Sequence, residues 1–166
     1  MILGMSLSTL TVVHVLLSLI GLGSGLVVVL GLLGGKRLDG WTALFLATTV
    51  ATSATGFLFP FDHLLPSHIV GITSLLVLAV AILARYQFRL AGGWRRAYVV
   101  CAVLALYLNA FVALVQAFLK VPALKALAPT QGEPPFAIAQ VVVLALFIVL
   151  GVSAARRFHP EPAGRG

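Results

Sequence analysis

The sequence predicts an all-α integral membrane bundle with five transmembrane helices. Of its 166 residues, 61% are hydrophobic and only 9% are charged, and the mean hydropathy is +1.13. Soluble domains usually carry about 25% charged residues, so lipid is the solvent that suits this composition. Apolar runs long enough to cross a bilayer recur along the chain, and basic residues gather at their ends. Residues 1–166 are therefore expected to form a single transmembrane domain.

The first span is expected over residues 7–33, where the apolar run exceeds the ~20 residues that a crossing needs. The segment before it has no basic residue, so it does not resemble a signal peptide and is interpreted as part of a retained span. The second span, residues 41–59, is rich in Ala, Thr and Ser. Its hydroxyls are expected to bond back to their own helix.

Prolines and basic residues mark the starts of the other spans. The third, residues 67–84, follows Pro66, and the fourth, residues 97–119, follows a linker rich in arginine. The fifth, residues 136–155, begins after a proline pair, which suits the first turn of a helix. Between the last two spans lies a long outer loop, residues 120–135. Within that loop, residues 121–127 are expected to form a short interfacial helix.

The positions of the basic residues predict the orientation. Five spans place three basic segments on one side of the membrane, and only Lys120 and Lys125 on the other. Because basic loops stay in the cytoplasm, we expect the N-terminus outside and the C-terminus in the cytoplasm. The same distribution argues against nucleic-acid binding despite a net charge of +7. The residues of the basic side are Lys36, Arg37, Arg85, Arg89, Arg95, Arg96, Arg156, Arg157 and Arg165. Trp41, Tyr86, Trp94 and Tyr98 are expected to form an aromatic belt on that side.

Small and polar residues indicate which helix faces point into the bundle. Thr11, His14, Ser18, Gly21 and Gly25 lie on one face of the first span, and the two glycines form a GxxxG pair. Such faces allow close helix contact in membranes. Amides are costly in a bilayer unless they are paired. Three of them, Asn109, Gln116 and Gln140, are therefore also expected to face inward.

Histidines and glutamines are predicted to meet in the outer leaflet, beneath the turn formed by residues 59–68. Histidine within a membrane span is uncommon and indicates a candidate functional site. Two imidazoles on different helices are suited to ligate a haem. Imidazole and amide groups can instead hydrogen-bond a quinone head group. The residues expected to contact such a cofactor are His14, His68, Gln116 and Gln140. A divalent metal would use His14, His63, His68 and Asp62.

Two classes of function remain open from the sequence. The first is a redox-related membrane protein that binds haem b, a quinone or a metal at this cluster. The alternative is a non-catalytic accessory subunit that docks on a larger membrane complex, or on its own copies, through glycine-rich helix faces. No nucleophile motif, P-loop or dinucleotide fingerprint supports an enzyme. The single cysteine, Cys101, excludes an internal disulfide.

Two resemblances add to this interpretation. Tyr107-Leu108-Asn109 and the segment from Leu127 to Phe136 resemble a pattern in small polytopic inner-membrane proteins of proteobacteria that have no assigned function. This resemblance covers roughly the C-terminal half and implies a bacterial inner membrane. In general build, with His14 and His68 on different helices, the chain is also similar to small di-histidine b-type cytochromes, which implies haem b.

Overall fold

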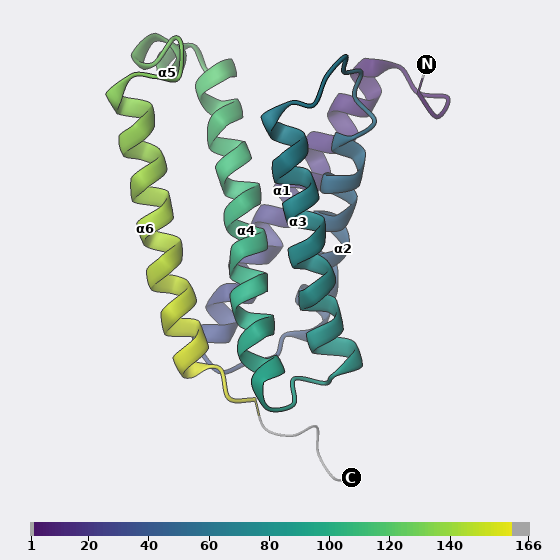
Figure 1. The fold of residues 1–166 in the computed structure, drawn as a ribbon, viewed down its shortest axis with the longest axis vertical. Helices are drawn as coiled ribbons and strands as arrows, with labels where there is room; N and C mark the ends of the chain where they lie inside the picture. The colour runs from purple at the N-terminus through teal and green to yellow at the C-terminus, as the bar shows by residue number, and fades with distance from the viewer. Residues whose placement is uncertain (1, 161–166) are drawn as a thin grey trace.

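The chain folds into an up-and-down bundle of long helices, with one short helix at one end (Figure 1). The computed structural model describes residues 2–160, so Arg165 of the predicted basic side lies outside the described part. Within that part the regular elements are helical, apart from one isolated bridge between Ile2 and Met5. The helices are α1 (Leu7–Leu33), α2 (Asp39–Gly56), α3 (Pro66–Ile82), the π-helical turn η1 (Leu83–Gln87), α4 (Gly93–Lys120), α5 (Pro122–Leu127) and α6 (Pro134–Arg157).

Four of these helices are long and apolar enough to cross a membrane. They are α1, α3 continued by η1, α4 and α6, so the chain has the character of a multi-pass membrane protein. The fifth long helix, α2, runs the height of the bundle with its neighbours (Figure 1), but it is not among the four. Its 18 residues include seven with side-chain hydroxyls or charge (Asp39, Thr42, Thr48, Thr49, Thr52, Ser53 and Thr55), which lower its apolar character.

Local sequence signals explain where the helices begin. The hydroxyl of Ser6 accepts a hydrogen bond from the backbone N–H of Thr9 at 3.1 Å and caps α1. Prolines occupy the first positions of α3, α5 and α6, where a missing N–H costs nothing. The short helix expected at residues 121–127 is present as α5.

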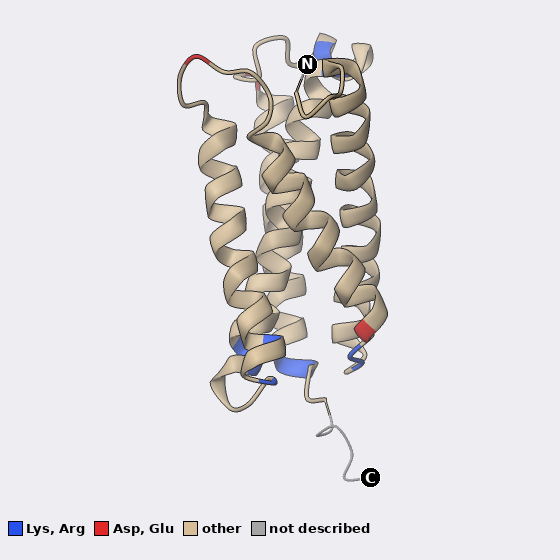
Figure 2. Cartoon of the chain, turned by 90° about the vertical axis from the view of Figure 1, so that its right-hand side faces the viewer, with Lys and Arg blue, Asp and Glu red and all other residues tan. Residues whose placement is uncertain are grey.

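The two ends of the bundle differ in charge (Figure 2). The end that carries the loop between α1 and α2, the loop between α3 and α4, and the end of α6 holds most of the arginines. We call it the arginine end. The opposite end carries the N-terminal segment, the loop between α2 and α3, and α5, and we call it the histidine end. The basic residues of the arginine end are Lys36, Arg37, Arg85, Arg89, Arg95, Arg96, Arg156 and Arg157.

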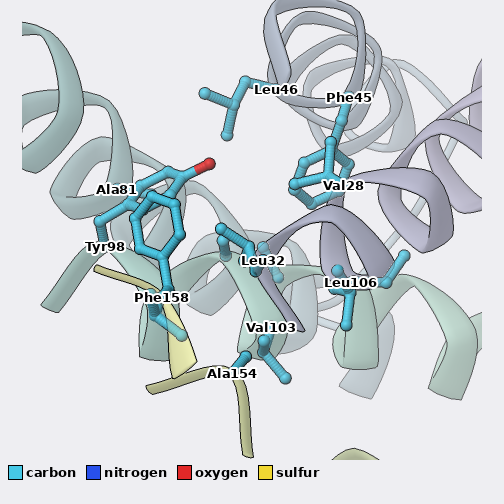
Figure 3. Packing of buried hydrophobic residues seen from close by; sticks show 14 of the residues in the cluster. Val28, Leu32, Phe45, Leu46, Ala81, Tyr98, Val103, Leu106, Ala154 and Phe158 are labelled. Carbon is cyan, nitrogen blue, oxygen red and sulfur yellow. The ribbon is translucent and has the colours of Figure 1, made fainter. Parts of the chain in front are cut away.

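The hydrophobic core lies mainly toward the arginine end. Gly25 of α1 makes the close helix contact possible, because a Cβ there would lie 2.5 Å from Leu106 Cδ1 and 2.9 Å from Phe45 Cε2. Figure 3 shows this cluster, to which all the long helices contribute. Its labelled members are Val28, Leu32, Phe45, Leu46, Ala81, Tyr98, Val103, Leu106, Ala154 and Phe158.

Two arginines connect helices at the arginine end. Arg85 lies in η1 and is 2% exposed. Its guanidinium donates to the carboxylate of Asp39 and, at 3.1 Å, to the backbone carbonyl of Arg37. It also lies over the ring of Tyr98, with 5.2 Å between the guanidinium carbon and the ring centroid. Arg85 therefore joins α3 to the start of α2 and to α4.

The second of these arginines, Arg95, joins α4 to α6. Its guanidinium donates to the carbonyl of Ala155 at 3.2 Å and to the carbonyl of Phe158. The Ala155 carbonyl belongs to the last turn of α6, and the Phe158 carbonyl belongs to the residue that follows this helix. Carbonyls at a helix end lack intrahelical partners, and a basic side chain can supply them. The start of α4 and the end of α6 are thereby held side by side.

The predicted aromatic belt is present in part. Trp41, Tyr86 and Trp94 are exposed at the arginine end, where Trp94 stacks on Phe88 with 4.1 Å between ring centroids. Tyr98, in contrast, is fully buried. Its position one turn and more inside α4 places it beneath Arg85, so it belongs to the core rather than to the belt.

Candidate functional site

A polar chamber of about 110 Å³ lies between α1, α2, α3 and α4, toward the histidine end. Both histidines that the sequence places in helices contribute to its wall. Hydroxyl and amide side chains supply most of the remaining polar atoms. The lining residues are His14, Ser18, Thr49, Thr52, Ser53, Gly56, Phe57, Ser67, His68, Val70, Gly71, Ser74, Leu108, Asn109 and Val112.

His14 reaches the chamber from α1 and is held by α2. Its Nδ1 lies 2.8 Å from Thr55 Oγ1, and its ring packs edge-on against Phe59. Thr55 already donates its only hydroxyl hydrogen to the carbonyl of Ala51 at 2.8 Å. The Nδ1 of His14 is therefore the donor toward Thr55, and Nε2 of the neutral ring is left as an acceptor.

His68 offers a hydrogen-bond donor at Nε2, whereas His14 offers an acceptor there. His68 lies in the first turn of α3, is 5% exposed, and packs against Phe57 and Phe61. The backbone N–H of Leu65 donates to Nδ1 of the His68 ring at 3.0 Å, and the backbone N–H of His68 donates to the carbonyl of Leu65 at 2.9 Å. Because Nδ1 accepts, the neutral ring carries its hydrogen on Nε2 and offers a donor.

Hydrogen bonds between helices form the chamber walls. Asn109 of α4 accepts from the hydroxyl of Ser18 at 2.8 Å and donates to its carbonyl at 3.2 Å, which joins α4 to α1. The hydroxyl of Ser53 in α2 donates to that of Ser74 in α3 at 3.1 Å. Thr49 is 1% exposed, and its hydroxyl has no partner in the described protein. The chamber thus contains a buried polar group that a ligand or water can satisfy.

The size of the chamber limits what it can hold. An engineered cavity of about 150 Å³ accepts a benzene ring, so a chamber of about 110 Å³ is on the scale of one six-membered ring. A haem contains four pyrrole rings and does not fit without separating the helices. His68 also opposes ligation, because an axial histidine usually donates from Nδ1, whereas this Nδ1 accepts. The chamber as it stands is therefore too small for haem b.

The residues predicted for a metal site do not form one group. His14 and His68 line the chamber, but Asp62 and His63 are exposed in the turn between α2 and α3. Within residues 2–160 no cluster of three or more His, Cys, Asp or Glu side chains could hold a metal ion. The turn directs the two residues before Leu64 toward the surface, while the cap at Leu65 holds His68 inside.

The two glutamines predicted to contact a cofactor lie outside the chamber. Gln116 is exposed near the end of α4. Gln140 of α6 has both amide atoms buried and without a partner among the described residues, but α6 contributes no residue to the chamber wall. The expectation that amides face inward is met by Asn109 and by the buried amide of Gln140, but not by Gln116, which lies nearer the end of α4.

Sequence reasoning missed the contribution of α2. The sequence predicted that the hydroxyls of α2 bond to the backbone of their own helix. This prediction is confirmed for Thr48, Thr52 and Thr55. Ser53 instead bonds across to α3, and Thr49 bonds to nothing described. The spacing of Thr49, Thr52, Ser53 and Gly56 is the signal that could have found this polar stripe, because residues three, four and seven apart share one helix face.

Comparisons with models of protein families, with curated proteins and with solved structures find no match to this chain.

Proposed function

We propose that this multi-pass protein crosses a bacterial inner membrane five times and binds the ring of a quinone or quinol in the chamber. A role in membrane electron transport follows from such a ligand. The observation that supports this proposal most directly is the opposite polarity of the two imidazoles. His14 offers an acceptor at Nε2 and His68 offers a donor at Nε2, on different helices that line one chamber of ring size.

A quinol suits this pair better than an oxidised quinone does. Each quinol hydroxyl can donate and accept, so one can donate to His14 while the other accepts from His68. A quinone has carbonyl oxygens, which only accept, so the neutral His14 gains no hydrogen bond from it. Since a neutral hydrogen bond contributes about 1 kcal/mol, we expect the quinol to bind about five-fold more tightly.

Equilibrium titrations of the protein in lipid nanodiscs test this proposal. Quinol and quinone with the same short alkyl tail are titrated under reducing and oxidising conditions, and binding is followed by calorimetry. The quinol preference should disappear in His14→Leu, because that change removes the acceptor that only the quinol can use. The His68→Leu variant should weaken both forms. The matched control, His63→Leu, alters an exposed histidine of the same end and should leave both affinities unchanged.

Two results would overturn the proposal. One is equal affinity of the wild-type protein and the two chamber variants for both ligands, provided that their unfolding temperatures in detergent are similar. The other is a visible spectrum of the purified protein with a Soret band and with sharp α and β bands on reduction. That spectrum would establish haem b, for which the chamber would have to open.

The proposed topology has its own support and test. Helix α2 runs alongside four helices that meet the requirements for a span, and about 27 Å of helix from 18 residues nearly matches a ~30 Å hydrocarbon core. Basic residues at the arginine end favour a cytoplasmic position for that end. A reporter fused after Arg157 should then be active in the cytoplasm, and a cysteine replacing Asp62 should react with an impermeant reagent added outside. The reverse pattern would refute this orientation.

The alternative function is that of an accessory subunit in a larger membrane complex, and one observation favours it. Only 6% of the most apolar window of α6 is buried, against 39% for α1 and for α4, so α6 offers a wide apolar face. The glycine-rich face of α1 is not available for such docking, because Gly21 and Gly25 pack against α2 and α4. A native mass that contains only this chain, together with a five-fold quinol preference, would exclude the accessory role.

A further inference from the structure

We propose that the groove between α4 and α6 binds an anionic phospholipid, with an acyl chain in the groove and the phosphate between Arg96 and Arg156. The groove has a volume of about 260 Å³ and is lined almost entirely by apolar side chains. Its floor is formed by Val103 and Phe147, which are 5% and 8% exposed. The full lining is Val100, Val103, Leu104, Tyr107, Leu144, Phe147, Ile148, Gly151 and Val152.

Gly151 shapes the groove by allowing α6 to approach α4. A Cβ on this glycine would lie 3.4 Å from Val103 Cγ1, which leaves a shallow path between the two rows of side chains. Val100, Ile148 and Val152 stand at the sides and are 53%, 56% and 47% exposed. A channel of this composition suits a hydrocarbon chain rather than a polar ligand.

Two arginines lie one helical turn beyond the groove, on the side of the arginine end. On α4, Arg96 precedes Val100 by one turn and continues the same stripe of side chains. On α6, Arg156 follows Val152 by one turn and continues the stripe of Ile148 and Val152. Both arginines are exposed. The bonds from Arg95 to the carbonyls of Ala155 and Phe158 hold these two helix ends side by side.

The two positive charges of Arg96 and Arg156 favour the binding of an anion. Within residues 2–160, the salt bridges at the arginine end join Asp39 to Arg37 and Arg85, on the α2 and α3 side. No described carboxylate pairs with Arg96 or Arg156. The guanidinium fork matches phosphate oxygens well, and basic residues at a membrane surface favour anionic over zwitterionic lipids. A phospholipid supplies both the phosphate and the chain that the groove can hold.

This site is separate from the proposed quinone chamber. The groove and the chamber share no lining residue and lie on different sides of α4. Failure of one proposal therefore leaves the other intact.

Native mass spectrometry of the protein extracted from mixed vesicles tests this site. The vesicles contain equal amounts of phosphatidylglycerol and phosphatidylcholine with the same acyl chains. We expect the retained lipid to be enriched about tenfold in phosphatidylglycerol, and about twofold in Arg96→Gln/Arg156→Gln, because each basic residue near a surface attracts anionic lipid appreciably. The control Lys36→Gln/Arg89→Gln removes the same charge elsewhere on the arginine end and should keep the tenfold enrichment.

A second pair of variants tests the groove itself. Leu104→Trp fills it and should reduce the amount of retained lipid, whereas Leu146→Trp, on an exposed part of α6 outside the groove, should not. If Leu104→Trp does not fold, Val152→Trp serves in its place.

Four outcomes would contradict the lipid site. The first is equal retention of the two lipids by the wild-type protein. The second is an equal loss of enrichment in the Lys36→Gln/Arg89→Gln control, which would show a general surface effect. The third is a change in oligomeric mass, rather than in retained lipid, when the groove is filled, because the groove would then be an interface between copies. Displacement of the lipid by glycerol 3-phosphate alone would likewise show a phosphate site that needs no acyl chain.

Discussion

The two ends of the bundle are held together by different kinds of interaction. At the arginine end, buried or half-buried guanidinium groups bond to carbonyls and to a carboxylate on other helices, above a dense apolar core. At the histidine end, neutral bonds among serine, threonine, asparagine and histidine surround a chamber. Charged hydrogen bonds are stronger than neutral ones. We therefore expect the arginine end to contribute more to the stability of the bundle than the histidine end, where a chamber interrupts the packing.

The largest effect is expected where close packing is tested directly. Gly25→Leu introduces a side chain whose Cβ alone would lie 2.5 Å from Leu106, so α1 would have to move away from α2 and α4. We expect a loss of about 3 kcal/mol in the free energy of unfolding, measured by denaturation in detergent. Gly23→Leu is the control, since a Cβ there meets nothing within 4 Å. Equal losses in both variants would mean that the dense core does not hold the helices together.

The next effect concerns the charged network. Asp39→Asn removes the carboxylate from Arg85, which is only 2% exposed and cannot be hydrated fully. Hydrogen bonds to charged groups contribute about 1.5–3 kcal/mol. Because the Asp39 side chain is 73% exposed and solvent weakens such pairs, we expect a loss at the lower end, about 1.5 kcal/mol in unfolding free energy. Asp62→Asn, at an exposed aspartate of the histidine end, should cost much less. If the two variants unfold alike, the contrast between the ends is not one of charge.

A smaller loss should follow from changing the chamber wall. Asn109→Ala removes two bonds to Ser18, and interhelical bonds in membranes contribute about 0.6 kcal/mol each. We expect a loss of about 1 kcal/mol in unfolding free energy, together with weaker quinol binding. Gln116→Ala changes an exposed amide of the same helix and serves as the control. A loss in Asn109→Ala as large as that in Asp39→Asn would contradict the view that the histidine end is the weaker one.

The smallest effect concerns the loop before α6. The hydroxyl of Thr130 donates to Glu133 at 2.8 Å, and this bond lowers the pKa of the Glu133 carboxyl. Because the folded pKa is lowered, the stabilising contribution is present above the ordinary glutamate pKa and is lost as the pH falls through the lowered value. Thr130→Val should raise the carboxyl pKa toward its ordinary value in an NMR titration. An unchanged titration would show that the bond does not form in solution.

The sequence predicted the helices better than the site. Proline and glycine punctuation defines the starts of α3 and α6, and the bounds of α1 were predicted as residues 7–33. The end of α2 was placed too late, at residue 59. Phe57 and Phe59 leave the helix to pack on His68 and His14, and this contact depends on other helices. The apolar run alone therefore could not reveal where α2 stops.

Whether a polar side chain is buried depends on its hydrogen-bonding partners in other segments, which the sequence alone does not show. His14 and Asn109 were placed inward correctly, because polar side chains deep in a span need partners. Gln116 lies close enough to the helix end to face outward, where water satisfies its amide. Arg85 was assigned to a surface linker, whereas η1 continues α3 and buries it against Asp39. Such burial is favourable only with the carboxylate and carbonyls of another segment in place.

The π-helical turn η1 has a consequence for the rotational phase of α3. A π-turn contains one residue more than an α-turn, and each residue advances a helix by about 100°. Deleting Leu83 or Ala84, the two residues of this turn that precede Arg85, would restore α-helical winding and rotate Arg85 relative to the stripe that precedes it. The extra residue thus acts as a phase shift, which lets the apolar side chains of α3 keep their own orientation while the guanidinium turns toward Asp39.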